Sequence, residues 1–194
     1  MKYQVILADP PWAYHDKCCA GKRGAEFKYP VLNLQALCAL PVPAIADENA
    51  LLFLWATGPL LPDALKVMDA WGFPYRTPAF VWVKTSGPVG LHFPRLAWGM
   101  GNWTRSNAEF CLLGVRGRPK RMSASVHQVV VAPRLAHSAK PPEVRTKIDQ
   151  LVGAVPNRLE LFARERALGW DATGLELDGK DVRDFLGEEA PDLV

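Results

Sequence analysis

The stretch ILADPPWAY, residues 6–14, places an aspartate, two prolines and a tryptophan directly after a hydrophobic run. Prolines cannot continue a hydrogen-bonded strand, so Pro10 and Pro11 predict that a strand ends here in a rigid turn. Such a turn would present the Asp9 carboxylate, backbone carbonyls and the Trp12 ring together. The carboxylate and a carbonyl could accept the two N–H bonds of a planar exocyclic amine and make its nitrogen more nucleophilic, while the ring supports the base. The alternative is structural, because Asp-Pro-Pro is a common turn and a nearby tryptophan can belong to the core.

Two further stretches combine positive charge with turn-forming or aromatic residues. RLAWGMGNWTR, residues 95–105, alternates arginines with Trp98 and Trp103, and GVRGRPKRMS, residues 114–123, groups four cations around a Gly-Pro turn. These cations form either a solvated hairpin tip or a set of phosphate contacts, and the second interpretation requires a polynucleotide substrate. The net charge of +3 and the pI of 8.7 are compatible with nucleic acid without indicating it. The four cations are Arg116, Arg118, Lys120 and Arg121.

The bulk composition suits a single globular domain over residues 1–194. Hydrophobic residues make up 49% of the chain and charged residues 22%, which allows a sizeable core. No apolar run reaches the roughly 18 residues that span a bilayer, and no charged-then-apolar leader opens the chain, so we expect a cytoplasmic protein with no membrane partner. The four cysteines follow neither a CxxC nor a disulfide spacing, which favours free thiols over a metal site.

Strand-like and helix-like segments alternate along the chain. Continuous apolar runs predict strands, and spacings of three to four residues predict helices that end at Gly72 and Gly153. This alternation predicts an α/β fold with an open, mostly parallel, doubly wound sheet and helices on both faces. The strands are expected at 3–8, 50–55, 79–83, 108–115, 127–132 and 158–163, and the helices at 33–39, 59–72 and 140–153.

Two Gly-rich segments without periodicity, 13–30 and 85–106, each follow a predicted strand directly. Loops of this length inside a compact domain are usually functional or mobile. Ligands of open α/β sheets bind at the carboxyl ends of the strands. We therefore expect both segments to border one crevice.

Six motifs in order resemble the MT-A70 family of S-adenosylmethionine-dependent adenine-N6 methyltransferases. The resemblance covers residues 3–179 and implies a Rossmann-like methyltransferase fold. The family includes the eukaryotic messenger-RNA m6A writer and compact bacterial and phage DNA enzymes. The motifs are ADPPW (8–12), LLFLWAT (51–57), FVWVKT (80–85), NAEFCLLGVRGRPKR (107–121), HSAKPPE (137–143) and LELFARERALGWD (159–171).

For the acceptor, the resemblance implies that Asp9 and the Pro10 carbonyl hold the target amine, Pro11 shapes the turn and Trp12 flanks the adenine. A duplex base would have to be flipped out of its stack to reach them. The other side chains implied at the base are Tyr29 in FKYP, Lys84 in WVKT and Glu109 in NAEF. To these we add the ring of Trp103 and, as phosphate contacts, Arg116, Arg118 and Arg121.

For the cofactor, the resemblance implies S-adenosyl-L-methionine. Lys140 matches the lysine that pairs with the methionine carboxylate, Arg164 lies against the ribose and carboxylate, and Glu176 binds the ribose hydroxyls, with Asp9 also at the cofactor. The residues agree with this assignment, because a zwitterionic cofactor needs a cation and an acceptor. A solvated lysine and a surface ion pair are the structural alternatives for Lys140 and Arg164. Leu175 stands where relatives commonly carry asparagine.

The motifs predict methyl transfer to N6 of adenine in DNA, with RNA as the alternative because the same motifs serve both polymers. Cytosine-N4 enzymes usually carry serine before Pro-Pro, and amide and guanine enzymes carry asparagine, whereas this chain has Asp9. A third alternative is a non-catalytic subunit that scaffolds an active partner, although such subunits have eroded DPPW motifs. The sequence leaves open the target sequence and whether the chain forms a homodimer.

Overall fold

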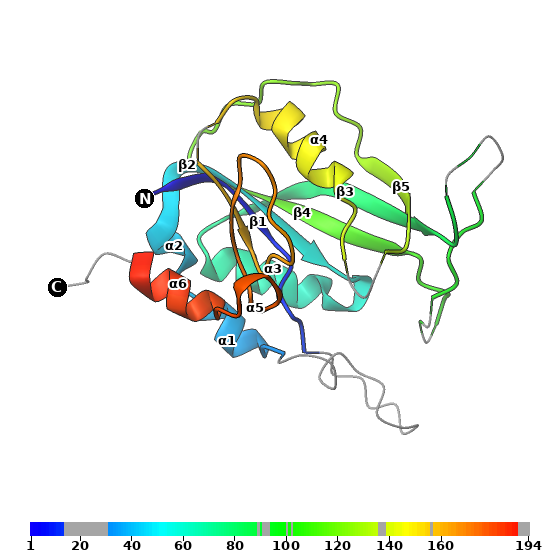
Figure 1. Cartoon of the computed structure of the whole chain (residues 1–194), viewed down its shortest axis with the longest axis horizontal. Helices are drawn as coiled ribbons and strands as arrows, with labels where there is room; N and C mark the ends of the chain where they lie inside the picture. Colours follow the sequence, from blue (N-terminus) through cyan, green and yellow to red (C-terminus); the bar gives the residue numbers. More distant parts are fainter. Residues whose placement is uncertain are drawn as a thin grey trace.

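A computed structural model describes residues 1–13, 31–88, 90, 94–99, 101, 103–135, 139–155 and 157–189. Within these ranges seven strands form one sheet in the order β5-β3-β4-β2-β1-β6-β7 (Figure 1). The strands are β1 Tyr3–Ala8, β2 Ala46–Ala56, β3 Tyr75–Thr85, β4 Ala108–Arg116, β5 Val129–Pro133, β6 Arg158–Leu161 and β7 Asp171–Thr173. In the same ranges, no helix is both long and apolar enough to cross a membrane.

Strand β4 runs against the rest of the sheet. It is antiparallel to β2 and β3, whereas β1 is parallel to β2 and β6, β3 to β5, and β6 to β7. The prediction of an open, mostly parallel sheet is therefore confirmed. Because β4 is reversed, its first residues lie beside the carboxyl ends of its neighbours, with Glu109 opposite Trp82. Its last residue, Arg116, lies opposite Ala50, towards the other edge of the sheet.

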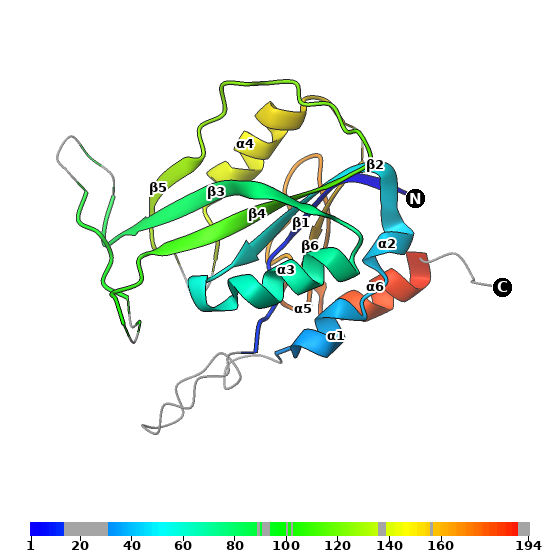
Figure 2. The same cartoon turned by 180° about the vertical axis from the view of Figure 1, so that it is seen from behind.

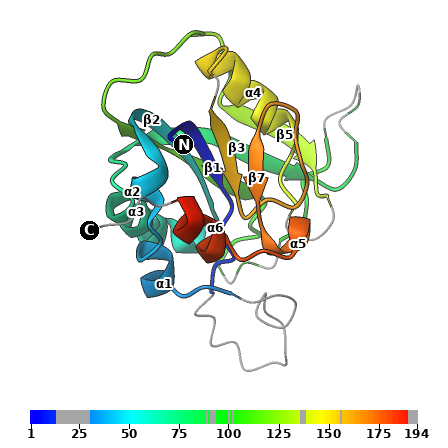
Figure 3. The ribbon, with the colours of Figure 1, turned by 60° about the vertical axis from the view of Figure 1, so that its left-hand side comes forward.

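Helices cover both faces of the sheet (Figures 1 and 2). One face packs against α4, Glu143–Val152, through Val144, Ile148 and Val152. The opposite face packs against α1 Leu34–Cys38, α2 Val42–Ile45, α3 Leu61–Ala70 and α6 Val182–Glu189. The remaining helical segments are the 3-10 helix η2, Gly58–Leu60, and α5, Leu175–Asp178, which follows the edge strand β7 (Figure 3). This arrangement is the predicted doubly wound architecture.

The predicted strands are all present, with bounds that differ for physical reasons. β2 begins at Ala46 rather than residue 50. Its first four residues, ADEN, are mostly polar and therefore do not stand out as an apolar run. β6 ends at Leu161 rather than residue 163, because Phe162 adopts a φ of 62°, which leaves the extended region. The short elements β7, α2, α5 and α6 were not predicted.

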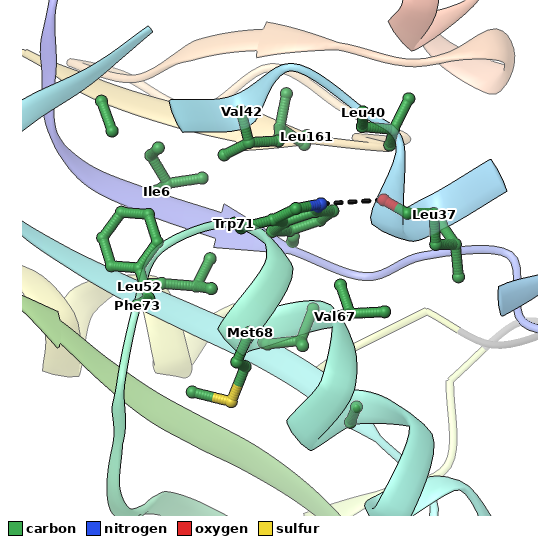
Figure 4. Packing of buried hydrophobic residues seen from close by; sticks show 14 of the residues in the cluster. Ile6, Leu37, Leu40, Val42, Leu52, Val67, Met68, Trp71, Phe73 and Leu161 are labelled. Carbon is green, nitrogen blue, oxygen red and sulfur yellow. Dashed lines mark hydrogen bonds between the residues drawn. The ribbon is translucent and has the colours of Figure 1, made fainter. Parts of the chain in front are cut away.

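The first helices are tied to the core by specific hydrogen bonds. Asn33 caps α1 through its Oδ1 atom, which accepts from the Ala36 N–H at 2.8 Å. The indole Nε1 of Trp71, directly after α3, donates to the Leu37 carbonyl at 2.8 Å in the middle of the buried cluster (Figure 4). This bond joins the end of α3 to α1, and α1 follows the segment that leaves β1.

We expect Trp71→Phe to lower the free energy of unfolding by about 1–3 kcal/mol, because the smaller ring loses both the buried hydrogen bond and packing volume. Denaturant unfolding monitored by circular dichroism measures the change. Trp98→Phe is the matched control, because Trp98 is exposed, and it should stay within about 0.5 kcal/mol of the wild type. Equal losses in the two variants would contradict the interpretation.

Candidate active site

The chain leaves β1 through a narrow turn at Pro10 and Pro11. The Trp12 N–H donates to the Pro10 carbonyl at 2.9 Å, which closes a three-residue turn around Pro11. Leu32 then returns to this turn: its N–H donates to the Pro11 carbonyl at 2.9 Å, and Trp12 and Leu32 form an isolated parallel bridge. Trp12 and Leu32, which flank segment 14–30, are thus held side by side. Tyr29 lies outside the described residues.

The Trp12 ring is in the core rather than at an open crevice. Its side chain is 7% exposed, and its Nε1 donates to the Trp55 carbonyl at 3.0 Å. This geometry favours the structural alternative stated for this ring, and Trp12 anchors the turn to β2. The carbonyl of Pro10 already accepts the Trp12 N–H, which leaves its second lone pair as a further acceptor.

A row of four charged side chains lies at the carboxyl edge of the sheet, by which we mean the side where the parallel strands reach their carboxyl ends. The Lys140 Nζ is 2.6 Å from Asp9 Oδ2 and 3.5 Å from Glu109 Oε2, and Lys84 pairs with the other Glu109 oxygen. Asp9 follows β1, Lys84 belongs to β3, Glu109 to β4, and Lys140 precedes α4. The reversed β4 is what brings Glu109 to this edge. Three residues predicted from different motifs therefore meet Asp9 in one cluster.

Burial and the neighbouring charges set the pKa values in this row. Burial raises the pKa of the Asp9 carboxyl above its usual range, against the lowering effect of the Lys140 ammonium. Burial alone would lower the pKa of Lys140, but the carboxylates of Asp9 and Glu109 more than offset it, so this pKa is raised. Lys140 is therefore a cation at neutral pH, and it also lies 5.7 Å from the centroid of the Trp55 ring.

Two hollows flank Asp9 and share Asp9, Phe162 and Arg164 as walls. The smaller, of about 90 Å³, is also lined by Pro10, Leu32, Leu175, Glu176 and Val182. The larger, of about 220 Å³, is also lined by Trp55, Lys140, Arg145 and Glu160. Glu176 meets Arg164 across the smaller hollow, with Oε1 3.2 Å from a guanidinium nitrogen. All four residues predicted at the cofactor, Asp9, Lys140, Arg164 and Glu176, therefore line these hollows.

Phe162 and the pair Arg145–Glu160 also line the larger hollow and were not predicted from the sequence. Phe162 is the one described non-glycine residue with positive φ, a conformation that costs of order 1 kcal/mol and often marks functional sites. Its position between Leu161 and Arg164 in the LELFAR motif was the available signal. Arg145 Nη1 lies 2.8 Å from Glu160 Oε2, and burial raises the pKa of that carboxyl against the effect of Arg145. This pair forms part of the floor of the larger hollow.

The predicted phosphate contacts do not join the cluster. Arg116 donates to the carbonyl of Pro43 in α2 at 3.1 Å, and the Arg118 N–H donates to Oδ1 of Asn49, in the first half of β2, at 2.7 Å. Arg121 follows them along the chain, beyond the end of β4. Because β4 is reversed, these arginines lie towards the opposite end of the sheet from Asp9, and their role as phosphate contacts stays a prediction. Trp103, by contrast, lies between β3 and β4 at the same edge as Asp9.

Comparisons with known proteins cover nearly the whole chain. The MT-A70 family model matches residues 3–176. A Type II methyltransferase, M.MunI, from Mycoplasma sp is 37% identical over 93% of this chain and 80% of its own length. The N(6)-adenosine-methyltransferase MT-A70-like protein of Drosophila melanogaster is 32% identical over 92% of the chain and 27% of its own length. The human N(6)-adenosine-methyltransferase catalytic subunit METTL3 is 30% identical over 100% of the chain, which spans 30% of that protein.

We expect Glu109→Gln to lower the free energy of unfolding by about 3 kcal/mol, because it removes the shared carboxylate of two part-buried lysines. Glu165→Gln is the control. Glu165 is likewise ion-paired, in its case with Arg145, but its side chain is 66% exposed. Its loss should cost less than about 1 kcal/mol. Denaturant unfolding at neutral pH compares the two, and a Glu109→Gln effect no larger than the control would show that the row is solvated.

Proposed function

The chain belongs to the MT-A70 family, and we propose that it transfers a methyl group from S-adenosyl-L-methionine to N6 of adenine in DNA. The observation that carries the proposal is the Asp9 carboxylate, held by Lys140 at the meeting point of the two hollows. The choice of DNA follows the Type II methyltransferase, of which the chain covers 80%, over the N(6)-adenosine-methyltransferases, of which it covers 27–30%.

The side chains around the hollows fit a zwitterionic sulfonium cofactor. Lys140 and Arg164 supply cations for its carboxylate, and Glu176 supplies an acceptor for its ribose hydroxyls. The carboxylates of Asp9 and Glu160 suit its positive groups. Phe162, with Leu175 and Val182, offers an apolar wall for its base. When bound, the cofactor supplies an electrophilic methyl group.

Asp9 prepares the acceptor nitrogen. An exocyclic amine donates its lone pair into the ring and is a poor nucleophile. Hydrogen bonds from its two N–H groups to the Asp9 carboxylate and the Pro10 carbonyl favour a more tetrahedral nitrogen with an available lone pair. As the new N–C bond forms, the bond between the methyl carbon and sulfur would break and leave a neutral thioether. The nitrogen must then lose a proton, and the Asp9 carboxylate accepts it. Only the ionised form of Asp9 can do both, and Lys140 favours this form.

The second candidate is the same transfer to RNA, which the names of the eukaryotic relatives favour. A non-catalytic role is the weaker alternative, since Asp9, Pro10 and Pro11 are intact and the charged row is assembled around them. Lys84 and Glu109 continue that row beyond the cofactor hollows. We place the acceptor base beside these two residues. Parallel assays on DNA and RNA oligomers separate the two polymers.

We expect Asp9→Asn to reduce methyl transfer by at least about 100-fold while cofactor affinity stays within about tenfold, because the change keeps the shape and removes the charge that acts on the amine. Single-turnover transfer of a labelled methyl group measures the rate, and calorimetry measures the affinity. Asp63→Asn, which alters an aspartate paired with Lys66 on α3, is the control and should keep full activity. Activity of Asp9→Asn within a few-fold of the wild type would refute the mechanism.

We expect Lys140→Ala to weaken cofactor binding by about 1.5–3 kcal/mol, the range for a hydrogen bond to a charged group. It should also shift the pH dependence of transfer. Asp9 must be ionised, so the rate falls as the pH falls through the Asp9 pKa. Lys140 lowers that pKa, hence its removal moves the acid limb to higher pH. Calorimetry and a pH–rate profile test both effects. An unchanged affinity and an unchanged acid limb in the folded variant would show that Lys140 neither binds the cofactor nor tunes Asp9.

A further inference from the structure

Two tryptophans between β3 and β4 differ from every other tryptophan of the described residues. Trp98 is 69% exposed and Trp103 is 100% exposed, whereas Trp12, Trp55, Trp71, Trp82 and Trp170 are all buried. A large aromatic ring left in water forfeits the burial that stabilises most tryptophans. Exposed apolar groups of this size commonly mark interaction sites.

The segment that carries these rings is fixed to the catalytic edge of the sheet. The Ala97 N–H donates to the Lys84 carbonyl, and the Lys84 N–H donates to the Asn107 carbonyl, both at 2.7 Å. Leu96 also forms an antiparallel bridge with Thr85. Since Lys84 belongs to the charged row, the exposed rings lie on a segment anchored to the site itself. Figures 1 and 2 show this segment extending beyond the ends of β3 and β4.

The described part of the segment is folded tightly on itself. A side chain at Gly99 would collide with the Ser106 carbonyl, and one at Gly101 with the Thr104 carbonyl. The backbone on either side of Trp103 is therefore in close contact, and only glycine permits that approach. Trp103, which is fully exposed, lies in the sequence between the residues of these two close approaches.

The surroundings of the rings are positively charged. Arg95, Arg105 and Arg134 are exposed, and the Arg105 guanidinium lies 5.3 Å from the centroid of the Trp98 ring. The Arg134 N–H donates to the Thr85 carbonyl, which places Arg134 at the same edge. The sequence has no aspartate or glutamate between residues 85 and 107. We call Arg95, Trp98, Trp103, Arg105 and Arg134 the tryptophan rim.

We propose that the tryptophan rim binds double-stranded DNA and that the Trp103 ring fills the gap left in the base stack when the target adenine is flipped out. This inference rests on the proposed function and specifies its acceptor as a duplex. Asp9 and Glu109 are largely buried, with side chains 20% and 12% exposed, so a stacked adenine cannot reach them. Extrusion costs a few kcal/mol, and an inserted apolar ring offsets part of that cost. The three arginines contact the flanking phosphates.

A ring that fills the gap in the base stack, which we call a wedge, is needed only when the target base is paired and stacked. A residue that simply contacts DNA would affect paired and unpaired substrates alike. We expect Trp103→Ala to slow single-turnover methylation of a paired duplex at least tenfold. Its rate should stay within twofold of the wild type on the same single strand, and on a duplex whose target adenine faces an abasic site. A pool of oligomers with randomised flanks avoids assuming a target sequence.

Trp103→Phe is the conservative variant, and it should retain most of the duplex activity because a phenyl ring still fills the gap. The Trp103 ring is exposed, so the thermal unfolding of Trp103→Ala should match that of the wild type. With 2-aminopurine at the target position, the wild type should raise the fluorescence of the duplex and Trp103→Ala should not.

Equal rate losses on all three substrates, or no loss on the paired duplex, would overturn the wedge while leaving the proposed function standing. A wild-type enzyme active on single strands but inactive on every duplex would also overturn it. A wild-type enzyme that methylates no DNA oligomer but methylates RNA would overturn both the duplex acceptor and the choice of DNA.

Discussion

The ion pair between Asp9 and Lys140 joins positions 131 residues apart in the sequence, and the site depends on it. A carboxylate as buried as that of Asp9 would protonate or cost several kcal/mol without a nearby cation. Lys140 supplies that cation, Glu109 shares it, and Lys84 compensates Glu109. Two positive and two negative charges alternate in this row, so it can be buried as a neutral unit. Each member can also exchange one partner for a ligand group of the same sign.

The direction of one strand decides which side chains can join that row. Strand β4 is inserted in reverse between β2 and β3, so its two ends serve opposite edges of the sheet. The first end brings Glu109 to the crevice together with the exposed segment that precedes it. The other end carries Arg116 away from the crevice, to a contact with the carbonyl of Pro43. A fully parallel sheet would have separated Glu109 from Asp9.

Much of this arrangement could be predicted from the sequence, because it follows from local patterns. Continuous apolar runs located the strands, since strands buried on both faces lack polar alternation. The prolines after Asp9 identified the turn at the carboxyl edge, where ligands of such sheets bind. Lys140, Arg164 and Glu176 were assigned to the site by the resemblance to the MT-A70 family. The bounds of β2 and the very short elements were missed because their residues are polar or too few to show a period.

The features that the sequence did not place depend on tertiary structure. An apolar run has no direction, so nothing in the β4 sequence shows that Arg116 and its neighbours lie at the far edge. Burial of a particular ring is also a matter of tertiary contact: Trp12 and Trp103 both stand in loops rich in glycine or proline, yet one donates to the carbonyl of Trp55 and the other is fully exposed. The left-handed backbone of Phe162 likewise reflects its surroundings rather than its residue type.

The bridge between Trp12 and Leu32 has a consequence for how such enzymes diversify. It holds Trp12 and Leu32, the residues that flank segment 14–30, together by backbone hydrogen bonds, and Trp12 is independently anchored to β2. We call the bridge between Trp12 and Leu32 the neck. The strands and the four charged residues of the row all lie outside segment 14–30. Lengthening a flexible loop costs only about 0.6 kcal/mol for each doubling of its length. The neck is thus a natural grafting point, where an exchanged insert could give a lineage a new recognition specificity while the methyl-transfer machinery stays unchanged.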